Sequence, residues 1–240
     1  MKAASVATKK VKPVHPKATI SFRHNILPPL MGVLMFLGVL GFLNGQWITA
    51  QVQYYLLPLR PASIMPASSN LKLDPNAPAH IIIPSVGIDA PFVTNETSYD
   101  PAHVQIALRN GIVHYGTTAL PGEVGNVVAI GHSSGQLWSP GHYKFAFTLL
   151  NKVPDRGLVY IDYKGTRYIY RVTSREVVDP TDISILDQTN TPQLTMITCT
   201  PVGVSTHRLV LHATQISPSP KTAVTRNLAP QPITAAKLPQ

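Results

Sequence analysis

The sequence predicts a mainly β protein: a closed barrel of seven or eight short strands with one or two short helices, preceded by an N-terminal transmembrane helix. Three observations predict this architecture. Between about residues 80 and 216, short runs rich in β-branched and aromatic residues alternate with turn signals. Helical periodicity is scarce in the same stretch, and many short strands with few helices favour a barrel. Ahead of it, residues 26–43 form an almost wholly apolar run whose helical length approaches the thickness of a bilayer core.

The charge of the chain is divided unevenly. The net charge of the 240 residues is +9, which at first favours a nucleic-acid partner. All eleven acidic residues, however, lie between Asp74 and Asp187, and residues 74–216 carry nine Lys and Arg, a net charge of −2. The excess positive charge therefore belongs to the two ends of the chain. A slightly acidic domain with basic ends argues against a nucleic-acid partner and favours a membrane topology.

The N-terminal end predicts a membrane anchor. Residues 1–25 are expected to form a cytoplasmic arm, because they carry basic residues and no acidic ones: Lys2, Lys9, Lys10, Lys12, Lys17 and Arg23. Residues 26–50 are expected to form a transmembrane signal-anchor helix, because the apolar run is longer than that of a cleaved signal peptide and no clear cleavage site follows. A cleaved signal peptide is the alternative. By the positive-inside rule, the anchor is single-pass in the cell membrane and the rest of the chain is extracellular.

Two further segments are rich in proline. Residues 51–79 predict an extended stalk between the anchor and the globular part. Residues 217–240, with five prolines and no acidic residue, predict a disordered tail. The globular part is then residues 80–216.

Within residues 80–216, β-branched and alternating patterns predict seven strands. They span residues 80–86, 88–93, 126–132, 157–163, 166–178, 193–199 and 206–214. The residues Tyr163-Lys164-Gly165-Thr166, between two aromatic runs, predict a tight hairpin turn. Residues 144–153 predict one helix and residues 101–108 a second.

Cys199 is the only cysteine, and it ends the apolar run QLTMITC, just before a Pro/Gly turn. A single cysteine cannot form a disulfide within the chain, so this thiol is either buried packing or a nucleophile. A thiol nucleophile needs a basic neighbour, and its acyl intermediate needs a donor for the oxyanion. Arg208 is such a donor if the turn returns it beside Cys199, although an arginine that opens a strand commonly forms a surface ion pair. His132 ends an apolar run beside small residues, where a barrel would present a side chain at a groove.

The segments around these residues resemble one family. LTMITCTPVGVSTHRLVLHA resembles the signature of the sortases, cysteine transpeptidases of bacterial cell surfaces, in which TLxTC is followed by an arginine that opens the next strand. LRNGIVHYGTTALPGEVGNVVAIGHSSG resembles the family's segment leading into its catalytic histidine, and IIIPSVGIDAPFV resembles its first two strands. The resemblance covers about residues 80–216. The sequence departs from the pattern at Met196, where the motif has leucine, and at Ser133-Ser134, where an arginine often follows the histidine. The class within the family stays open, with a class D- or E-like type expected.

The resemblance implies a sortase-like barrel and covalent catalysis. Cys199 would be the nucleophile, His132 the general acid and base, and Arg208 the group that stabilises the substrate and the oxyanion. The substrates would be surface proteins with an LPxTG-like C-terminal sorting signal, transferred through a thioacyl-enzyme to an amine acceptor of the cell envelope or a pilin. His114, in the family-like segment NGIVHYGT, and Thr198, directly before the nucleophile, are expected to contact substrate. No cofactor is expected.

Other interpretations stay open. A thiol peptidase would use water in place of the amine, and an anchored binding module would hold a peptide without covalent chemistry. Some relatives bind calcium through acidic loops, but solvated surface charge is the preferred interpretation of Glu176, Asp179, Asp182 and Asp187, and no metal site is expected. Pilus-building relatives often carry a lid with an Asp-Pro-aromatic element, whereas Asp74-Pro75 is followed by Asn76. General anchoring is therefore favoured over pilin polymerisation.

Overall fold

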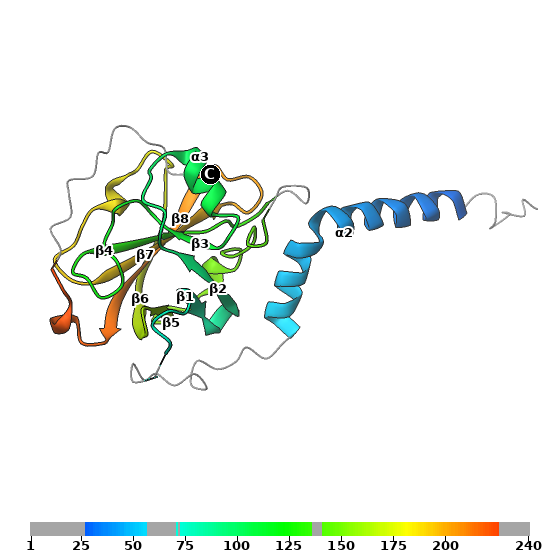
Figure 1. The fold of residues 1–240 in the computed structure, drawn as a ribbon. Helices are drawn as coiled ribbons and strands as arrows, with labels where there is room; N and C mark the ends of the chain where they lie inside the picture. Colours follow the sequence, from blue (N-terminus) through cyan, green and yellow to red (C-terminus); the bar gives the residue numbers. More distant parts are fainter. Residues whose placement is uncertain (1–26, 57–70, 72, 136–140, 226–240) are drawn as a thin grey trace, which may run out of the picture. The chain divides into compact units, whose positions relative to one another are not determined.

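The computed structural model describes residues 27–56, 71, 73–135 and 141–225 (Figure 1). The chain divides into two compact units, residues 1–43 and 44–240, so the long N-terminal helix and the barrel are described separately. The predicted basic arm, most of the predicted stalk and residues 226–240 of the predicted tail lie outside the described residues.

Helix α2 (Leu27–Leu56) is 30 residues long, and it continues through the first six residues of the predicted stalk. Apolar surface surrounds its N-terminal half: five consecutive residues, Val33 to Leu37, each expose more than half of their surface. Among the residues whose placement is described, no helix is both long enough and apolar enough to cross a membrane.

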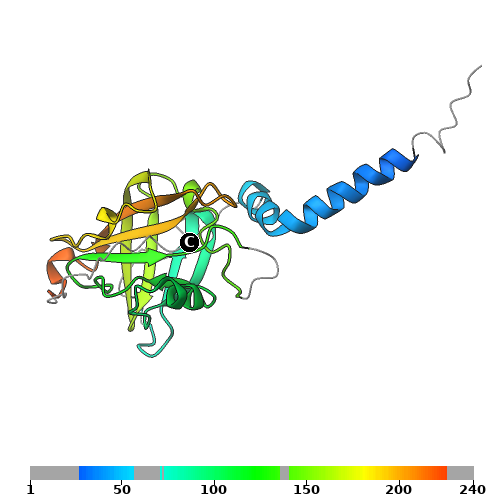
Figure 2. The same cartoon turned by 90° about the horizontal axis from the view of Figure 1, so that it is seen from above.

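Eight strands close into a barrel with the order β1-β2-β3-β4-β7-β8-β6-β5, and β5 returns to β1 (Figures 1 and 2). The strands are β1 (His80–Ile83), β2 (Ile88–Val93), β3 (Ile112–His114), β4 (Asn126–Ile130), β5 (Leu158–Tyr163), β6 (Thr166–Val178), β7 (Gln193–Thr200) and β8 (His207–Ser217). Two neighbouring pairs, β2–β3 and β4–β7, are parallel, and the others are antiparallel. The prediction of a closed, mainly β barrel is confirmed.

Local signals identify most elements correctly. Helix α3 (Pro101–Ala107) begins where Asp100 accepts a hydrogen bond from the Ala102 amide at 2.9 Å, with Pro101 at the first helical position. Strands β5 and β6 meet in a two-residue turn, in which Lys164 and Gly165 have φ values of 47° and 79°. Positive φ at both positions is typical of the type I′ hairpin turn, and the predicted hairpin is confirmed.

Three predictions about local structure were wrong or incomplete. The predicted helix at 144–153 is a series of turns ending in the 3₁₀ helix η3 (Leu150–Lys152), because Phe147 and Leu150 are buried in the barrel interior. The first predicted strand ends at Ile83, where the 3₁₀ helix η2 (Pro84–Val86) begins. Strand β3 was missed because its three residues are all buried and show no alternation.

The C-terminal boundary also differs from the prediction. The sequence predicts disorder from Ser217, but the chain continues through the 3₁₀ helix η5 (Pro220–Thr222) and pairs with the barrel at Val224. There, Val224 exchanges backbone hydrogen bonds with Gly122 and Val124 at 3.0 and 2.9 Å. These backbone contacts carry no side-chain pattern that a sequence could reveal.

Two apolar layers cover the two faces of the sheet. The inner layer fills the barrel and takes residues from the strands and from segment 147–153: on β7 these are Leu194 and Met196. The outer layer joins the opposite face of β4, β7 and β8 to α3 and to the 3₁₀ helix η4 (Ser184–Leu186); it includes Ile130, Ile197 and Val210. Side chains alternate between the two faces along each strand, so any residue of these strands can be assigned to one layer.

Candidate active site

Strands β4, β7 and β8 are consecutive neighbours in the barrel, and they bring the three predicted catalytic residues to one end of the sheet. Green β4, yellow-orange β7 and orange β8 lie side by side in both views (Figures 1 and 2). Across the antiparallel pair, Cys199 is directly opposite Arg208. Across the parallel pair, Ile130 is beside Ile197, and His132 and Cys199 each follow two residues later. Adjacent strands lie about 4.8 Å apart, so the register places the three residues side by side.

The link between β4 and β7 continues past the end of β4. The Gly131 amide donates to the Ile197 carbonyl at 3.1 Å, and Thr198 Oγ1 donates to the Gly131 carbonyl at 2.7 Å. The His132 carbonyl accepts from the Phe147 amide at 2.9 Å. A Cβ atom at position 131 would lie 2.6 Å from the Phe147 ring, so only glycine allows this close approach. The backbone that carries His132 is therefore fixed on both sides.

All three side chains belong to the outer face of the sheet. Along β7, Met196 and Thr198 belong to the inner face, so Cys199 belongs to the outer face together with Ile197. On β8, Arg208 shares the outer face with Val210. His132 follows an inward-directed Gly131 and shares the face of Ile130. We call the outer face of β4, β7, β8 and the neighbouring β6 the catalytic face.

Arg208 is 1% exposed, so the alternative of a surface ion pair is wrong. Its Nη1 donates to the carbonyls of Ser205 and His207 at 3.2 and 3.0 Å, which holds the guanidinium at the β7–β8 turn. Cys199 is a free cysteine and is buried, with 8% of its surface exposed. The directed N–H donors of a guanidinium opposite Cys199 suit an oxyanion that forms there.

His132 is half-buried, and this burial lowers the pKa of its imidazole below the usual value of 6.5. Desolvation disfavours the charged imidazolium, so the ring is neutral at neutral pH. A neutral imidazole can accept a proton, which is the property that a general base beside a thiol requires.

The turn that joins β7 to β8 is tied to the segment after His132. The Gly203 amide donates to Ser134 Oγ at 3.1 Å, across 69 residues of sequence. Within the turn, Gly203 and Ser205 have φ values of 84° and 61°, and the Val204 and Ser205 amides both donate to the Pro201 carbonyl at 3.0 Å. The serines at 133 and 134, which depart from the family's usual arginine, thus include one that fixes this turn.

A cavity of about 210 Å³ lies on the β4 side of the site, with His132 in its wall. The other lining residues come from the C-terminal end of α3 and from the loop after β4, which we call the His132 loop: Gln105, Leu108, Arg109, Ser134, Gly135 and Lys144. Two of them, Arg109 and Lys144, are basic, and none of the described residues that line the cavity is acidic.

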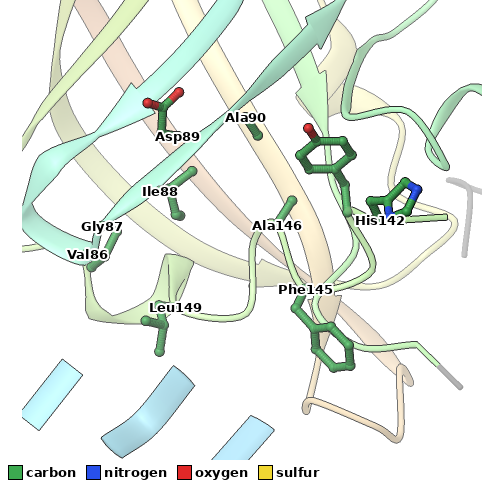
Figure 3. Close-up of a pocket in the computed structure, with 10 residues that line it drawn as sticks. Val86, Gly87, Ile88, Asp89, Ala90, His142, Phe145, Ala146 and Leu149 are labelled. Carbon is green, nitrogen blue, oxygen red and sulfur yellow. The ribbon is translucent and has the colours of Figure 1, made fainter. Parts of the chain in front are cut away.

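A larger hollow of about 280 Å³ lies elsewhere, between the η2–β2 turn and segment 142–149 (Figure 3). Ile88 and Ala90 line one side of it, and Ala146 and Leu149 the other. None of the three predicted catalytic residues lines it. The size of this hollow therefore does not make it the candidate site.

His114 and Thr198, the two predicted substrate contacts, lie on the inner face. Each is 3% exposed. His114 Nε2 is within hydrogen-bond distance of the Ala119 carbonyl and Thr118 Oγ1, and its ring packs edge-on against Phe92 at 6.1 Å. Thr198 contacts Gly131, as described above. Their positions give no support to direct contact with substrate. The Thr198 hydroxyl instead links β7, which carries Cys199, to the residue that precedes His132.

Neither of the two histidines of β8 is paired with Cys199. His212 lies on the catalytic face but is opposite Thr195, four residues from the Cys199–Arg208 pair. His207 alternates with Arg208 and contacts Thr206. Among the described residues, no group of three His, Cys, Asp or Glu side chains could hold a metal ion.

Sequence reasoning missed the residues that support the site rather than form it. These are Gly131, Ser134 and a polar group on the catalytic face made of Asn126, Thr195, His212 and Glu176. A signal existed for the last group, because Asn126 and Thr195 are polar residues within otherwise apolar strands. Their partnership depends on the parallel β4–β7 pairing, which no local pattern reveals.

Comparison with known proteins identifies the family. Residues 81–216, more than half of the chain, match the family model described as the Sortase domain. No curated protein matches the chain. Similar solved structures include sortase A from Corynebacterium diphtheriae (30% identity, 58% of this chain and 60% of that one, TM-score 0.48), its lid mutant (29%, 60% and 72%, 0.48), and sortase C-1 from Actinomyces oris (28%, 57% and 73%, 0.49). The match therefore spans less than two thirds of the C. diphtheriae sortase A chain. From the family match, the chain belongs to the sortases, a family of cysteine transpeptidases.

Proposed function

We propose that this protein cleaves an LPxTG-like sorting signal and transfers the surface protein that carries it to an amine acceptor of the cell envelope. The observation that carries the proposal is the register of three neighbouring strands: Cys199 is paired with Arg208 across β7 and β8, and His132 lies two residues beyond the Ile130–Ile197 pair of β4 and β7. The family match supports the reaction type. The sorting motif itself comes from the family resemblance.

In the first half of the reaction, the Cys199 thiol passes its proton to the neutral His132 imidazole. The thiolate attacks the carbonyl carbon of the Thr–Gly bond, and Arg208 donates hydrogen bonds to the oxygen that becomes negative. When the C–N bond breaks, the imidazolium of His132 returns the proton to the leaving amine. The acyl group is then a thioester of Cys199.

In the second half, an acceptor amine attacks the thioester carbon. A C–N bond forms, the C–S bond breaks, and His132 takes the proton that the amine loses. Cys199 leaves as a thiolate, and proton return from the imidazolium restores the starting state. The two halves use the same three groups in opposite directions.

The order of the strands suggests where the acceptor enters. Arg208 lies on the β8 side of Cys199 and His132 on the β4 side, so the acyl group is held toward Arg208 and the amine must approach from His132. The cavity beside His132 lies on that side, and its Arg109 and Lys144 favour an acceptor with a carboxylate near its amine. We therefore expect triglycine to react several-fold faster than triglycinamide, which has the same amine without the carboxylate. Replacing both Arg109 and Lys144 with glutamine should remove this preference.

We also propose that the chain is anchored in the cell membrane, with the catalytic barrel outside. The support is the sequence: residues 24–59 contain no Asp, Glu, Lys or Arg, and the residues ahead of them are basic and lack acids. The exposed apolar residues of α2 agree with this proposal. Protease added to intact cells should digest the barrel but spare the N-terminal arm. Release of the intact full-length chain by alkaline carbonate washing would exclude the anchor.

The experiment that tests the activity uses the full-length protein in detergent. It is incubated with a fluorescent LPxTG peptide and triglycine, and the products are identified by mass. We expect the peptide to be cut after threonine and joined to triglycine. The Cys199→Ala variant should form neither product. Joining by Cys199→Ala at the wild-type rate would refute the covalent mechanism, and hydrolysis alone by the wild type would favour a thiol peptidase.

A further inference from the structure

A continuous chain of polar contacts crosses four strands of the catalytic face, four residues along the strands from the Cys199–Arg208 pair. Thr195 Oγ1 donates to Asn126 Oδ1 at 2.8 Å, and it lies 3.1 Å from His212 Nδ1. On its other side, His212 Nε2 lies 2.9 Å from Glu176 Oε1. We call these four residues, Asn126, Thr195, His212 and Glu176, the outer network.

The contacts of the outer network determine where its protons are. The amide oxygen of Asn126 can only accept, so the single hydroxyl proton of Thr195 is used for that bond. Thr195 can then only accept from His212, which requires a proton on Nδ1. The Glu176 carboxylate accepts as well, which requires a proton on Nε2. The contacts are satisfied together only when His212 is an imidazolium.

The orientation of the Asn126 side chain is fixed independently. Its Nδ2 donates to the carbonyls of Ile185 and Asp187 at 3.1 and 3.2 Å, so the other terminal atom must be the oxygen that faces Thr195. The backbone amide of Asn126 also donates to Gln188 Oε1 at 3.0 Å. The outer network therefore reaches the segment between β6 and β7, which we call the η4 segment (residues 183–188).

The η4 segment shares an apolar cluster with residues that neighbour the predicted catalytic residues along β7 and β8. Its Ile185 and Leu186 belong to the same apolar cluster as Ile197 and Val210. Ile197 precedes Cys199 by two residues, and Val210 follows Arg208 by two, so both point from the catalytic face next to the reacting groups. A shift of the η4 segment would therefore change the packing of the cluster that contains Ile197 and Val210, each two residues from Cys199 or Arg208.

We propose that His212, as an imidazolium, is a positioning residue that fixes the η4 segment through Thr195 and Asn126, so that peptide binding depends on its proton. The proposal rests on the proposed function for the identity of the peptide. Loss of the proton leaves His212 with one N–H, so either the Thr195 contact or the Glu176 contact is lost. Of the described ionisable side chains, only that of Glu176 is within ion-pair distance of His212, and it stabilises the cation.

The structural part of the proposal can be tested without any substrate. Nitrogen NMR of the His212 ring in the full-length protein should show both nitrogens protonated at pH 7. Amide hydrogen exchange of the η4 segment should become at least about tenfold faster in Thr195→Val, which keeps the shape and removes the hydroxyl, because a tenfold change corresponds to the loss of roughly one buried hydrogen bond. Thr195→Ser should restore slow exchange.

A matched control is available on β6, the strand beside β8. Thr173 Oγ1 donates to the backbone carbonyl of His212 at 3.1 Å and lies outside the outer network, so Thr173→Val should leave exchange in the η4 segment unchanged. A neutral His212 ring at pH 7, or equal exchange in Thr195→Val and Thr173→Val, would overturn the proposal.

The functional part predicts a change in KM rather than in kcat. Thr195→Val should raise KM for the LPxTG peptide about fivefold to tenfold while kcat stays within about twofold, as expected when a binding wall is loosened and the reacting groups are kept. An equal fall of kcat in Thr195→Val, with KM unchanged, would contradict the positioning role. A wild-type enzyme without activity toward the peptide would refute the proposed function and leave the NMR and exchange results to decide on the network.

Discussion

Two hairpins of the barrel differ in what holds their turns. The β5–β6 turn is two residues long, and its shape follows from Lys164 and Gly165, both with positive φ. The β7–β8 turn is six residues long, from Pro201 to Thr206. Besides its internal hydrogen bonds it has contacts from beyond the turn: Ser134 binds the Gly203 amide, and Arg208 binds the Ser205 carbonyl. The first turn is determined by its own sequence, and the second depends also on the segments around it. The candidate chemistry is found at the second.

The largest effect is expected at Arg208. Arg208→Lys keeps the charge but loses the fork of donors that contacts the turn and would contact the oxyanion, so kcat/KM should fall about 100-fold. Steady-state kinetics with the LPxTG peptide and triglycine measures this. Arg171→Lys, an exposed arginine on β6, is the control and should have wild-type activity. Wild-type kcat/KM in Arg208→Lys would show that the guanidinium has no part in the reaction.

A smaller effect is expected where the turn meets the His132 loop. Ser134→Ala removes the acceptor of the Gly203 amide, and kcat should fall about threefold to tenfold, since one hydrogen bond that orders the turn is lost. Ser134→Thr keeps the hydroxyl and should retain most of the activity. If Ser134→Ala and Ser134→Thr have the same kcat, the contact between the two loops does not order the site.

The titration of His132 tests the environment of the site. Burial lowers the pKa of His132, so its neutral form should persist below pH 6.5 and disappear only as the pH falls through the lowered pKa. Carbon NMR of the His132 ring, recorded in Cys199→Ala so that the thiol does not titrate beside it, measures this pKa directly. A pKa above 6.5 would mean that a negative charge, rather than burial, controls this ring.

The smallest effect on activity is expected at the β5–β6 turn. Gly165→Ala places a Cβ at φ 79° and 3.1 Å from Pro75, so the free energy of unfolding should fall by about 1 kcal/mol, while kcat/KM per folded molecule should not change. Thermal unfolding monitored by circular dichroism measures the loss. Gly87→Ala has a similar φ of 66° without a nearby atom, and it should be destabilised less. A fall of kcat/KM in Gly165→Ala would show that the two hairpins are coupled.

The sequence predicts the elements that depend on local chemistry. The β5–β6 turn, the Asp100-capped helix α3 and the long strand β6 all carry their own signals. The TMITC motif and the arginine that follows it predict the pairing of Cys199 with Arg208. The alternation of side chains along β8 also predicts correctly that His212 shares the face of Arg208 and lies too far away to act with Cys199.

What the sequence could not predict depends on contacts between distant segments. The parallel pairing of β4 with β7 brings His132 to Cys199, yet the two strands are separated by more than 60 residues. Segment 144–153 has helical periodicity, but it is held as turns because Phe147 packs into the barrel interior and donates to the His132 carbonyl. Thr198 looked like a substrate contact because it adjoins Cys199, whereas alternation along β7 directs it to Gly131 on the inner face.

The most direct test of the central claim is the mass of the trapped intermediate. The full-length protein is mixed with an LPxTG peptide in the absence of an amine, quenched in acid, and digested to locate the added mass. We expect an acyl group on Cys199, formed by the wild type and strongly reduced in His132→Ala and Arg208→Lys. Cleaved peptide that accumulates while Cys199 stays unmodified, at the same rate in all three proteins, would contradict the covalent mechanism.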